Sequence, residues 1–131
     1  MRRPATTKTS ADQAADHIRE LFTAFGPVTV KRMFGGAGIY ARETMFAIAI
    51  DGVIYLKADA ETVPAFEREG MAPFTFIARK KSVATSYWRM PDSLYDDPEE
   101  LAQWSRLALT VAERAAATKK SKQKKTSKGA I

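Results

Sequence analysis

Hydrophobic positions near the start of the chain repeat with the period of an α-helix. Apolar side chains recur three and four residues apart, at Ala11, Ala14, Ala15, Ile18, Leu21, Phe22 and Phe25. They therefore share one helical face. Ser10 can cap the first turn, and Gln13 completes a capping box. Gly26-Pro27 ends the pattern, because glycine suits a left-handed C-cap and proline cannot continue a helix. The spacing predicts an amphipathic helix over residues 11–25.

The pattern then changes to that of β-strands. Residues 28–34 alternate apolar and polar side chains, and residues 38–42 form a second short segment after Gly35-Gly36. Segments 45–50 and 53–58 are joined by Asp51-Gly52, a strong signal for a two-residue hairpin. This part of the chain predicts four successive antiparallel strands.

The hairpin 45–58 has two apolar faces. A two-residue loop pairs residues 50 with 53, 48 with 55 and 46 with 57 on one face, and 49 with 54 and 47 with 56 on the other. The second face is rich in alanine and would let helices approach closely. The first carries Phe46, Ile48, Ile50, Val53 and Tyr55. It needs a helix or a second subunit to cover it, which predicts a homodimer.

The remaining elements alternate again between helix and strand. A short helix is expected from Glu61 or Thr62 to Gly70, followed by strands over 73–79 and 84–90 with a Lys80-Lys81-Ser82 turn. Asp97-Pro98-Glu99-Glu100 is typical of a helix start, with a cap, proline at N1 and glutamate at N3. The helix that follows has a stripe of Leu101, Trp104, Ala108, Val111 and Ala115 and ends at Thr118. The order α-β-β-β-β-α-β-β-α predicts an α+β domain with a mostly antiparallel sheet flanked by helices.

Composition narrows the classes of function. The 131 residues contain no cysteine and one histidine, His17. This excludes disulfide scaffolds, thiolate metal sites, multi-histidine metal sites and conventional catalytic triads. Apolar runs fall well short of the ~18 residues of a membrane span, and none follows Met1-Arg2-Arg3-Pro4 as a secretion signal requires. We expect a soluble, cytoplasmic protein without a cofactor or membrane partner.

The net charge of +6 comes from the ends of the chain. Residues 1–10 carry three cationic side chains, and residues 118–131 carry six lysines and no acid, whereas 11–117 hold 12 Lys and Arg against 15 Asp and Glu. A flexible basic segment is therefore expected over 1–9, a folded domain over 10–117 and an extended lysine-rich tail over 118–131.

The tail is the candidate nucleic-acid contact. Its cations are Lys119, Lys120, Lys122, Lys124, Lys125 and Lys128. Lysines alone neutralise phosphates without reading bases, so weak and salt-sensitive binding is expected. The alternative interpretation is a solubilising end with no partner.

A basic and aromatic constellation is the candidate ligand or partner surface. It comprises Arg79, Lys80, Lys81, Tyr87 and Arg89. Cations interleaved with aromatic rings can bind phosphates and stack bases. Alternatively, Trp88 faces the core while the lysine pair protects a hairpin tip.

Two further motifs have structural explanations. The segment 32–38 is rich in glycine but lacks the Lys-Ser/Thr of a P-loop, so a turn between strands is predicted. The acids Asp96, Asp97, Glu99 and Glu100 suit a helix N-terminus, where carboxylates cap free amides.

Several separated motifs resemble the TfoX N-terminal domain family. The resemblance rests on the segment 32–40 with Arg32, Met33, Phe34, Gly35, Gly36 and Gly38, on 45–47, on 55–57, on Pro73-Phe74, on 87–91 with Trp88 and Pro91, and on 97–101. It spans about residues 14–115. It implies a secretion-chaperone-like α+β fold, with these residues as a structural signature. The longer members of that family add a C-terminal helical domain and are co-regulators of competence-gene transcription that act with a cyclic-AMP receptor protein. The resemblance supplies no catalytic residues.

These observations predict a non-enzymatic regulatory or protein-interaction module linked to transcription or competence. Its protein partner would belong to the transcription machinery, and its basic ends would add weak attraction to nucleic acid. The alternative is a small-ligand or phosphate-binding domain that uses the segment from Arg79 to Arg89.

Overall fold

The computed structural model describes the backbone of residues 10–33 and 35–129 and the side chains of residues 13–33 and 35–118. Its elements are α1 (Ser10–Leu21), β1 (Thr29–Met33), β2 (Gly36–Ala41), β3 (Thr44–Ile50), β4 (Val53–Lys57), α2 (Val63–Arg68), β5 (Pro73–Ala78), β6 (Lys81–Arg89), the 3-10 helix η2 (Asp92–Asp96) and α3 (Pro98–Gly129). The predicted α+β class and the order of helices and strands are confirmed, with η2 as an addition.

The strands form one antiparallel sheet in the order β1-β2-β3-β4-β6-β5. After β4 the chain passes through α2, forms β5 at the outer edge and returns as β6 against β4. Arg42-Glu43, Asp51-Gly52 and Arg79-Lys80 each have positive φ at both residues. This conformation is typical of two-residue hairpins, since its twist matches that of the flanking strands.

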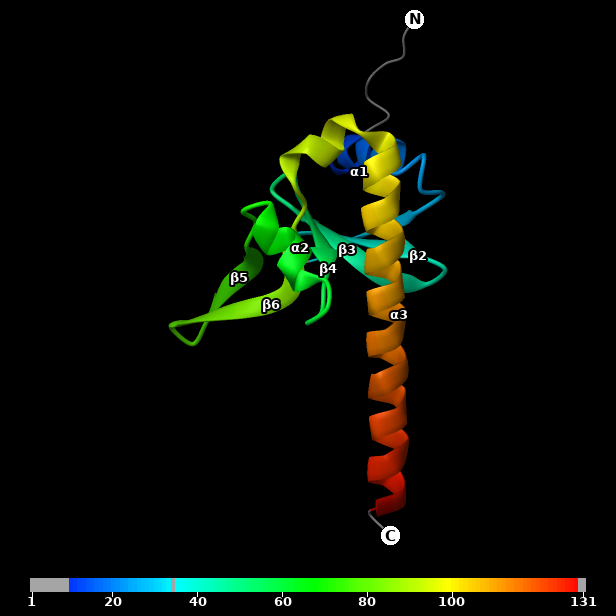
Figure 1. The fold of residues 1–131 in the computed structure, drawn as a ribbon, viewed down its shortest axis with the longest axis vertical. Helices are drawn as coiled ribbons and strands as arrows, with labels where there is room; N and C mark the ends of the chain where they lie inside the picture. The colour runs from blue at the N-terminus through cyan, green and yellow to red at the C-terminus, as the bar shows by residue number, and fades with distance from the viewer. Residues whose placement is uncertain (1–9, 34, 130–131) are drawn as a thin grey trace, which may run out of the picture.

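One row of side chains across the sheet builds the core. The row runs through Val30, Ile39, Ala47, Leu56 and Trp88, which are paired strand to strand and buried or half-buried. Helices α1, α2 and α3 pack on this face, and α3 lies across β3 and β4 (Figure 1). The alanine-rich face of the hairpin is therefore the helix-covered face, because small side chains let α3 approach the strands.

Phe46 departs from the predicted pairing. It is fully buried, with its ring centre 5.6 Å from that of Phe22 and 5.1 Å from that of Phe25. The β2–β3 register shifts here, since Ile39 pairs with Ala47 but Tyr40 pairs with Met45. Phe46 is the extra residue of this bulge, so strand alternation does not apply to it. The placement of Phe46 beside Ile48 on one face was therefore wrong, whereas the pairs 50–53, 48–55, 49–54 and 47–56 are confirmed.

The first helix is shorter than predicted. It ends at Leu21, and residues 22–25 form a tight turn in which Phe22 O accepts from the N–H groups of Phe25 and Gly26. Gly26 has φ +139°, so the glycine ends the turn rather than the helix. The early bend brings Phe22 and Phe25 onto Phe46.

Most of the glycine-rich segment 35–38 belongs to strand β2 rather than to a turn. Gly35 lies in the β1–β2 turn with φ +75°, but Gly36 and Gly38 belong to β2. A Cβ on Gly36 would clash with the carbonyl oxygen of Ala49. The explanation of all these glycines by a turn was therefore wrong, because Gly36 is required by close approach to the β3 backbone.

The turn between β5 and β6 lies one residue earlier than expected. Arg79 and Lys80 form it, and Lys81 and Ser82 are already in β6. Neither turn residue is glycine, asparagine or aspartate, so the usual turn signal is missing.

Helix α3 begins as predicted and ends later than predicted. Asp97 Oδ1 accepts from the Glu100 N–H at 3.2 Å, which confirms the cap. Leu101, Ala108 and Val111 are buried but Ala115 is exposed, since the helix projects beyond the sheet at its C-terminal end (Figure 1). The backbone stays helical to Gly129, so the predicted end at Thr118 and the extended tail were wrong. Lysine and glutamine are good helix formers, and cations near a helix C-terminus interact favourably with its dipole.

Candidate functional site

The second face of the sheet is the one that α1, α2 and α3 do not cover. The row next to the core row runs through Lys31, Gly38, Ile48, Tyr55 and Arg89. Tyr40 lies on the same face as Lys31, and Lys57 is paired directly with Tyr87. We call the surface formed by Lys31, Tyr40, Tyr55, Lys57 and Tyr87 the open face.

Side chains of the strands themselves cover the centre of this face. Ile48 is only 5% exposed. A Cβ on Gly38 would lie 2.7 Å from Met45 Sδ and 3.0 Å from Tyr40 Cε1, so these two side chains fold over the glycine. The apolar surface on which the homodimer was predicted is thus smaller than the sequence indicated, and the homodimer remains a prediction.

The lysines of the open face lie over its tyrosines. Lys31 Nζ is 4.7 Å from the centre of the Tyr40 ring, and Lys57 Nζ is 5.0 Å from that of Tyr87. Lys57 also donates a hydrogen bond of 2.6 Å to Ser86 Oγ. Burial of the Tyr87 hydroxyl, together with the nearby Tyr40, raises the pKa of Tyr87 above its usual range. The Tyr87 ring is therefore neutral at physiological pH and available to cations.

Acidic residues are absent from all six described strands. The strands carry five cations, at Lys31, Arg32, Lys57, Lys81 and Arg89, while the acids of 13–118 lie in helices, turns and connections. The negative sum over 11–117 therefore comes from helices, turns and connections, while the strands themselves are cationic.

The structure separates the predicted basic and aromatic constellation into two groups. Arg79, Lys80 and Lys81 lie at the tip of the β5–β6 hairpin, whereas Tyr87 and Arg89 lie where β6 pairs with β4. Lys81 and Arg89 are eight positions apart on β6, which corresponds to roughly 25 Å. Arg89 Nη2 is 3.5 Å from Asp92 Oδ1. Trp88 points to the core, where its ring centre is 6.1 Å from that of Phe66.

The outer half of the β5–β6 hairpin projects from the body, and we call residues 75–85 the arm (Figure 1). Pairing of β6 with β4 stops at Tyr87, followed by one hydrogen bond from Ala58 N–H to Ser86 O. Three apolar residues of the arm are exposed to solvent: Phe76 is 45% exposed, Ile77 71% and Val83 36%. Phe76 and Val83 are directly paired, so they form one apolar patch behind the three cations of the tip.

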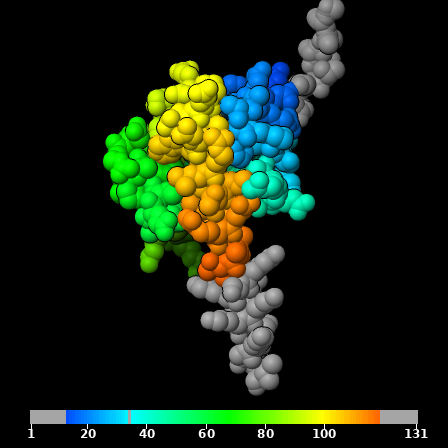
Figure 2. Space-filling model, turned by 45° about the vertical axis from the view of Figure 1, so that its right-hand side comes forward, coloured from blue at the N-terminus to red at the C-terminus, as the bar shows by residue number. Residues whose placement is uncertain are grey.

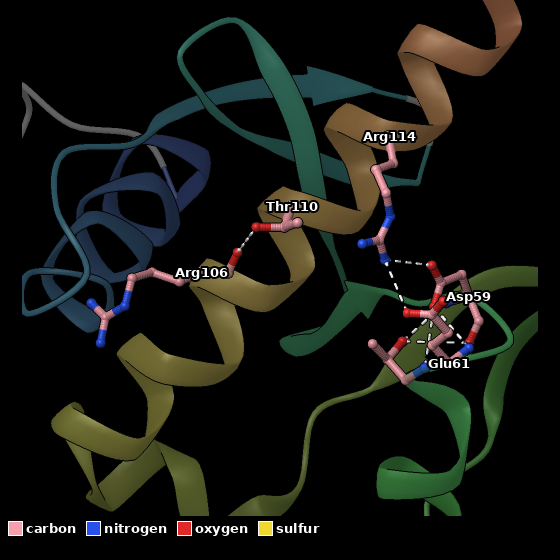
Figure 3. Close-up of polar contacts among 6 residues, drawn as sticks. Asp59, Glu61, Arg106, Thr110 and Arg114 are labelled. Carbon is pink, nitrogen blue, oxygen red and sulfur yellow. Dashed lines mark hydrogen bonds and ion pairs between the residues drawn. The ribbon is translucent and has the colours of Figure 1, made fainter.

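A polar cluster ties α3 to the segment after β4. Arg114 Nη2 lies 2.9 Å from Asp59 Oδ2 and 3.7 Å from Glu61 Oε1 (Figure 3). Burial raises the pKa of the Asp59 carboxyl, but the hydrogen bonds from Arg114 and from the Thr62 and Glu61 N–H groups outweigh it, so this pKa lies below its usual value of 3.8. The cluster therefore holds two segments of the chain together.

Hollows lie on the helix side of the sheet. One hollow of about 710 Å³ lies between part of α1 and strands β1–β4. Its lining residues include His17, Arg32 and Tyr95. Another, of about 520 Å³, is bounded by α2 and α3. On the visible face, η2 and α3 separate the green surface of α2 from the blue surface of α1 (Figure 2). The candidate residues Arg79 to Lys81, Tyr87 and Arg89 line neither hollow.

Among the residues that the structure describes, there is neither a cluster of metal-ligand side chains nor a membrane-spanning helix. No group of three or more His, Asp or Glu side chains is placed to share a metal ion. No helix among them is both long and apolar enough to cross a membrane.

Comparison with known proteins matches residues 20–112 to the model of the TfoX N-terminal domain. The match covers every strand, α2, η2 and all the buried residues of α3. The chain belongs to the TfoX N-terminal domain family. It is 28% identical over 102 residues to DNA transformation protein TfoX1 of Aliivibrio fischeri, covering 70% of this chain and 49% of that protein. It is 23% identical over 106 residues to Protein Sxy of Escherichia coli, covering 81% and 51%. The chain thus spans about half the length of these relatives.

The TfoX-like signature is spread over both faces of the sheet. Arg32, Met33, Gly35 and Gly36 border the 710 Å³ hollow, Gly38 lies under the open face, and Trp88 and buried Pro91 pack at the other end. Phe34 lies outside the described residues, as do residues 1–9 and the side chains of the six tail lysines.

The sequence indicated an uncovered face of the hairpin 45–58 but not that lysines and tyrosines of four strands meet on it. The signal for the open face was present as Tyr55-x-Lys57 and Tyr87-x-Arg89, because residues two apart on a strand share a face. The register that places the two pairs side by side is not readable from sequence alone.

Proposed function

We propose that this chain is a non-enzymatic regulatory module of competence, which acts by docking a protein partner of the transcription machinery. The names of its relatives support a regulatory context: one is a DNA transformation protein, and neither name describes a catalytic activity. Since the chain covers about half of each relative, the partner itself is part of the proposal.

The arm is the observation that carries this proposal. Phe76 and Val83 are exposed on one face of a ribbon that leaves the body and Ile77 on the other, so both faces of the arm offer apolar surface to a partner. Exposed apolar patches rimmed by charge are typical of interaction sites. The tip cations Arg79, Lys80 and Lys81 favour a partner with acidic residues around an apolar pocket.

The phosphate-binding alternative for this hairpin has less support. The tip cations and the pair Tyr87 and Arg89 lie at opposite ends of β6, too far apart to hold one small ligand. Arg89 is also engaged by Asp92.

The proposal is tested by crosslinking capture from the natural host with the intact chain as bait. The double variant Phe76→Ser, Ile77→Ser should lose the captured partner and lower the transformation frequency in cells. Leu107→Ser is the matched control, since Leu107 is an equally exposed apolar residue on α3, away from the arm. Equal capture by both variants, with both folded, would refute the arm as the docking element.

A further inference from the structure

We infer that the open face binds single-stranded nucleic acid through its tyrosine rings and lysines. The inference goes beyond docking by the arm, because the arm does not include Lys31, Tyr40, Tyr55, Lys57 or Tyr87. All five belong to strands whose other face is covered by helices.

Charge favours a polyanion on this surface. The described strands hold no acid, and the cations Lys31 and Lys57 stand among the tyrosines. The acids that border these strands lie in the turns at Glu43 and Asp51, at Asp59 after β4, and in η2, where Asp92 engages Arg89. A phosphodiester chain that crosses the strands meets cations and avoids these acids.

The same charges disfavour a second copy of the chain as the occupant. A two-fold interface places the same patch of both subunits together, so Lys31 and Lys57 would face a surface that carries the same two cations. No strand acid is available among the described residues to compensate them. Like charges brought together in this way are destabilising.

The rings favour single strands over duplex. Tyr40, Tyr55 and Tyr87 are half-buried side chains from β2, β4 and β6, and the ammonium groups above Tyr40 and Tyr87 show that these ring faces are not packed against apolar groups. Aromatic side chains on an uncovered sheet can stack two or three unpaired bases. Bases in a duplex are stacked on one another and cannot lie flat on the sheet.

The test measures binding of a fluorescent dT20 oligonucleotide to the intact chain in excess unlabelled random duplex, which saturates sites that only neutralise phosphates. Tyr40→Leu should weaken binding about fivefold or more, the usual contribution of one stacked base. Tyr40→Phe should retain it, because the ring is kept. Lys31→Gln should make the salt dependence shallower by about 0.7 in log affinity against log salt.

Arg106→Gln is the matched charge control, because Arg106 is exposed on α3 and its guanidinium has no hydrogen bond or ion pair among the described residues; only its carbonyl oxygen accepts from Thr110 (Figure 3). It should leave dT20 binding unchanged. Photo-crosslinking of an iodouracil-substituted oligonucleotide to peptides with Tyr40, Tyr55 or Tyr87 gives a readout that needs no variant. Equal affinity for dT20 and duplex, or crosslinks confined to residues 118–131, would overturn the inference. A variant that changes the sedimentation mass but not dT20 binding would instead assign this face to self-association.

Discussion

Lys57 and Tyr87 face each other across β4 and β6, with the lysine ammonium 5.0 Å from the centre of the tyrosine ring. The contact joins two strands that are separated in the chain by α2 and β5. It also places a cation and a ring at the point where the arm leaves the sheet. Stability and binding are therefore both sensitive to this pair.

Tyr87→Ala should destabilise the fold by about 2 kcal/mol, which is below the cost for a fully buried ring because Tyr87 is half-buried. Lys57→Met keeps most of the aliphatic stem and should cost less than about 1 kcal/mol. Urea unfolding at equal m-values measures both. A larger loss for Lys57→Met than for Tyr87→Ala would show that the ammonium, not the ring, holds the strands together.

Gly36 and Gly38 should respond differently to alanine. At Gly36 the new Cβ meets the backbone oxygen of Ala49, which cannot move without breaking the β2–β3 pairing, so a loss of about 2 kcal/mol or more is expected. At Gly38 the close atoms are the flexible ends of Met33 and Met45 and the ring edge of Tyr40, which can move. Thermal unfolding of the two variants compares them directly. Equal losses would contradict a backbone-imposed requirement at Gly36.

The Asp59–Arg114 pair should stabilise the fold in a pH-dependent way. Because the folded-state pKa of Asp59 is lowered, its contribution is present above pH 4 and is lost as pH falls through the folded-state value. Asp59→Asn keeps an acceptor for the two N–H groups but removes the charge. It should cost no more than about 1 kcal/mol at pH 7, since both partners are partly exposed.

Unfolding of the wild type and of Asp59→Asn at pH 7 and pH 3 checks this expectation, and the difference should shrink at pH 3. Glu61→Gln is the control, because Glu61 lies farther from Arg114 and is more exposed. A difference that grows toward low pH would contradict the lowered pKa.

Deletion of residues 119–131 should leave the melting temperature nearly unchanged. The buried residues of α3 end at Ala112, so the deleted helical backbone lies beyond the described core. If all six tail lysines contact phosphates, duplex binding by the intact chain should fall with a log–log salt slope of about −5, and the deleted chain should lose most of it. Equal, salt-insensitive affinities would leave the tail as a solubilising end.

Local sequence signals determined much of this protein. The Asp51-Gly52 turn and the alternation around it define the central hairpin and its alanine-rich face, because both depend on residues close in the chain. Asp97-Pro98 likewise marks the start of α3. The TfoX-like motifs indicate the family for the same reason.

Only the tertiary structure decided how the strands meet. The bulge at Phe46, the glycine-free turn at Arg79-Lys80 and the return of β6 to β4 depend on packing between distant segments. Composition gives one net charge for the whole body, whereas the fold shows that the strands carry only cations and that the acids lie in helices, turns and connections. Tyr40, Tyr55 and Tyr87 share one face because strand register, which follows from burial of the opposite face against the helices, aligns them.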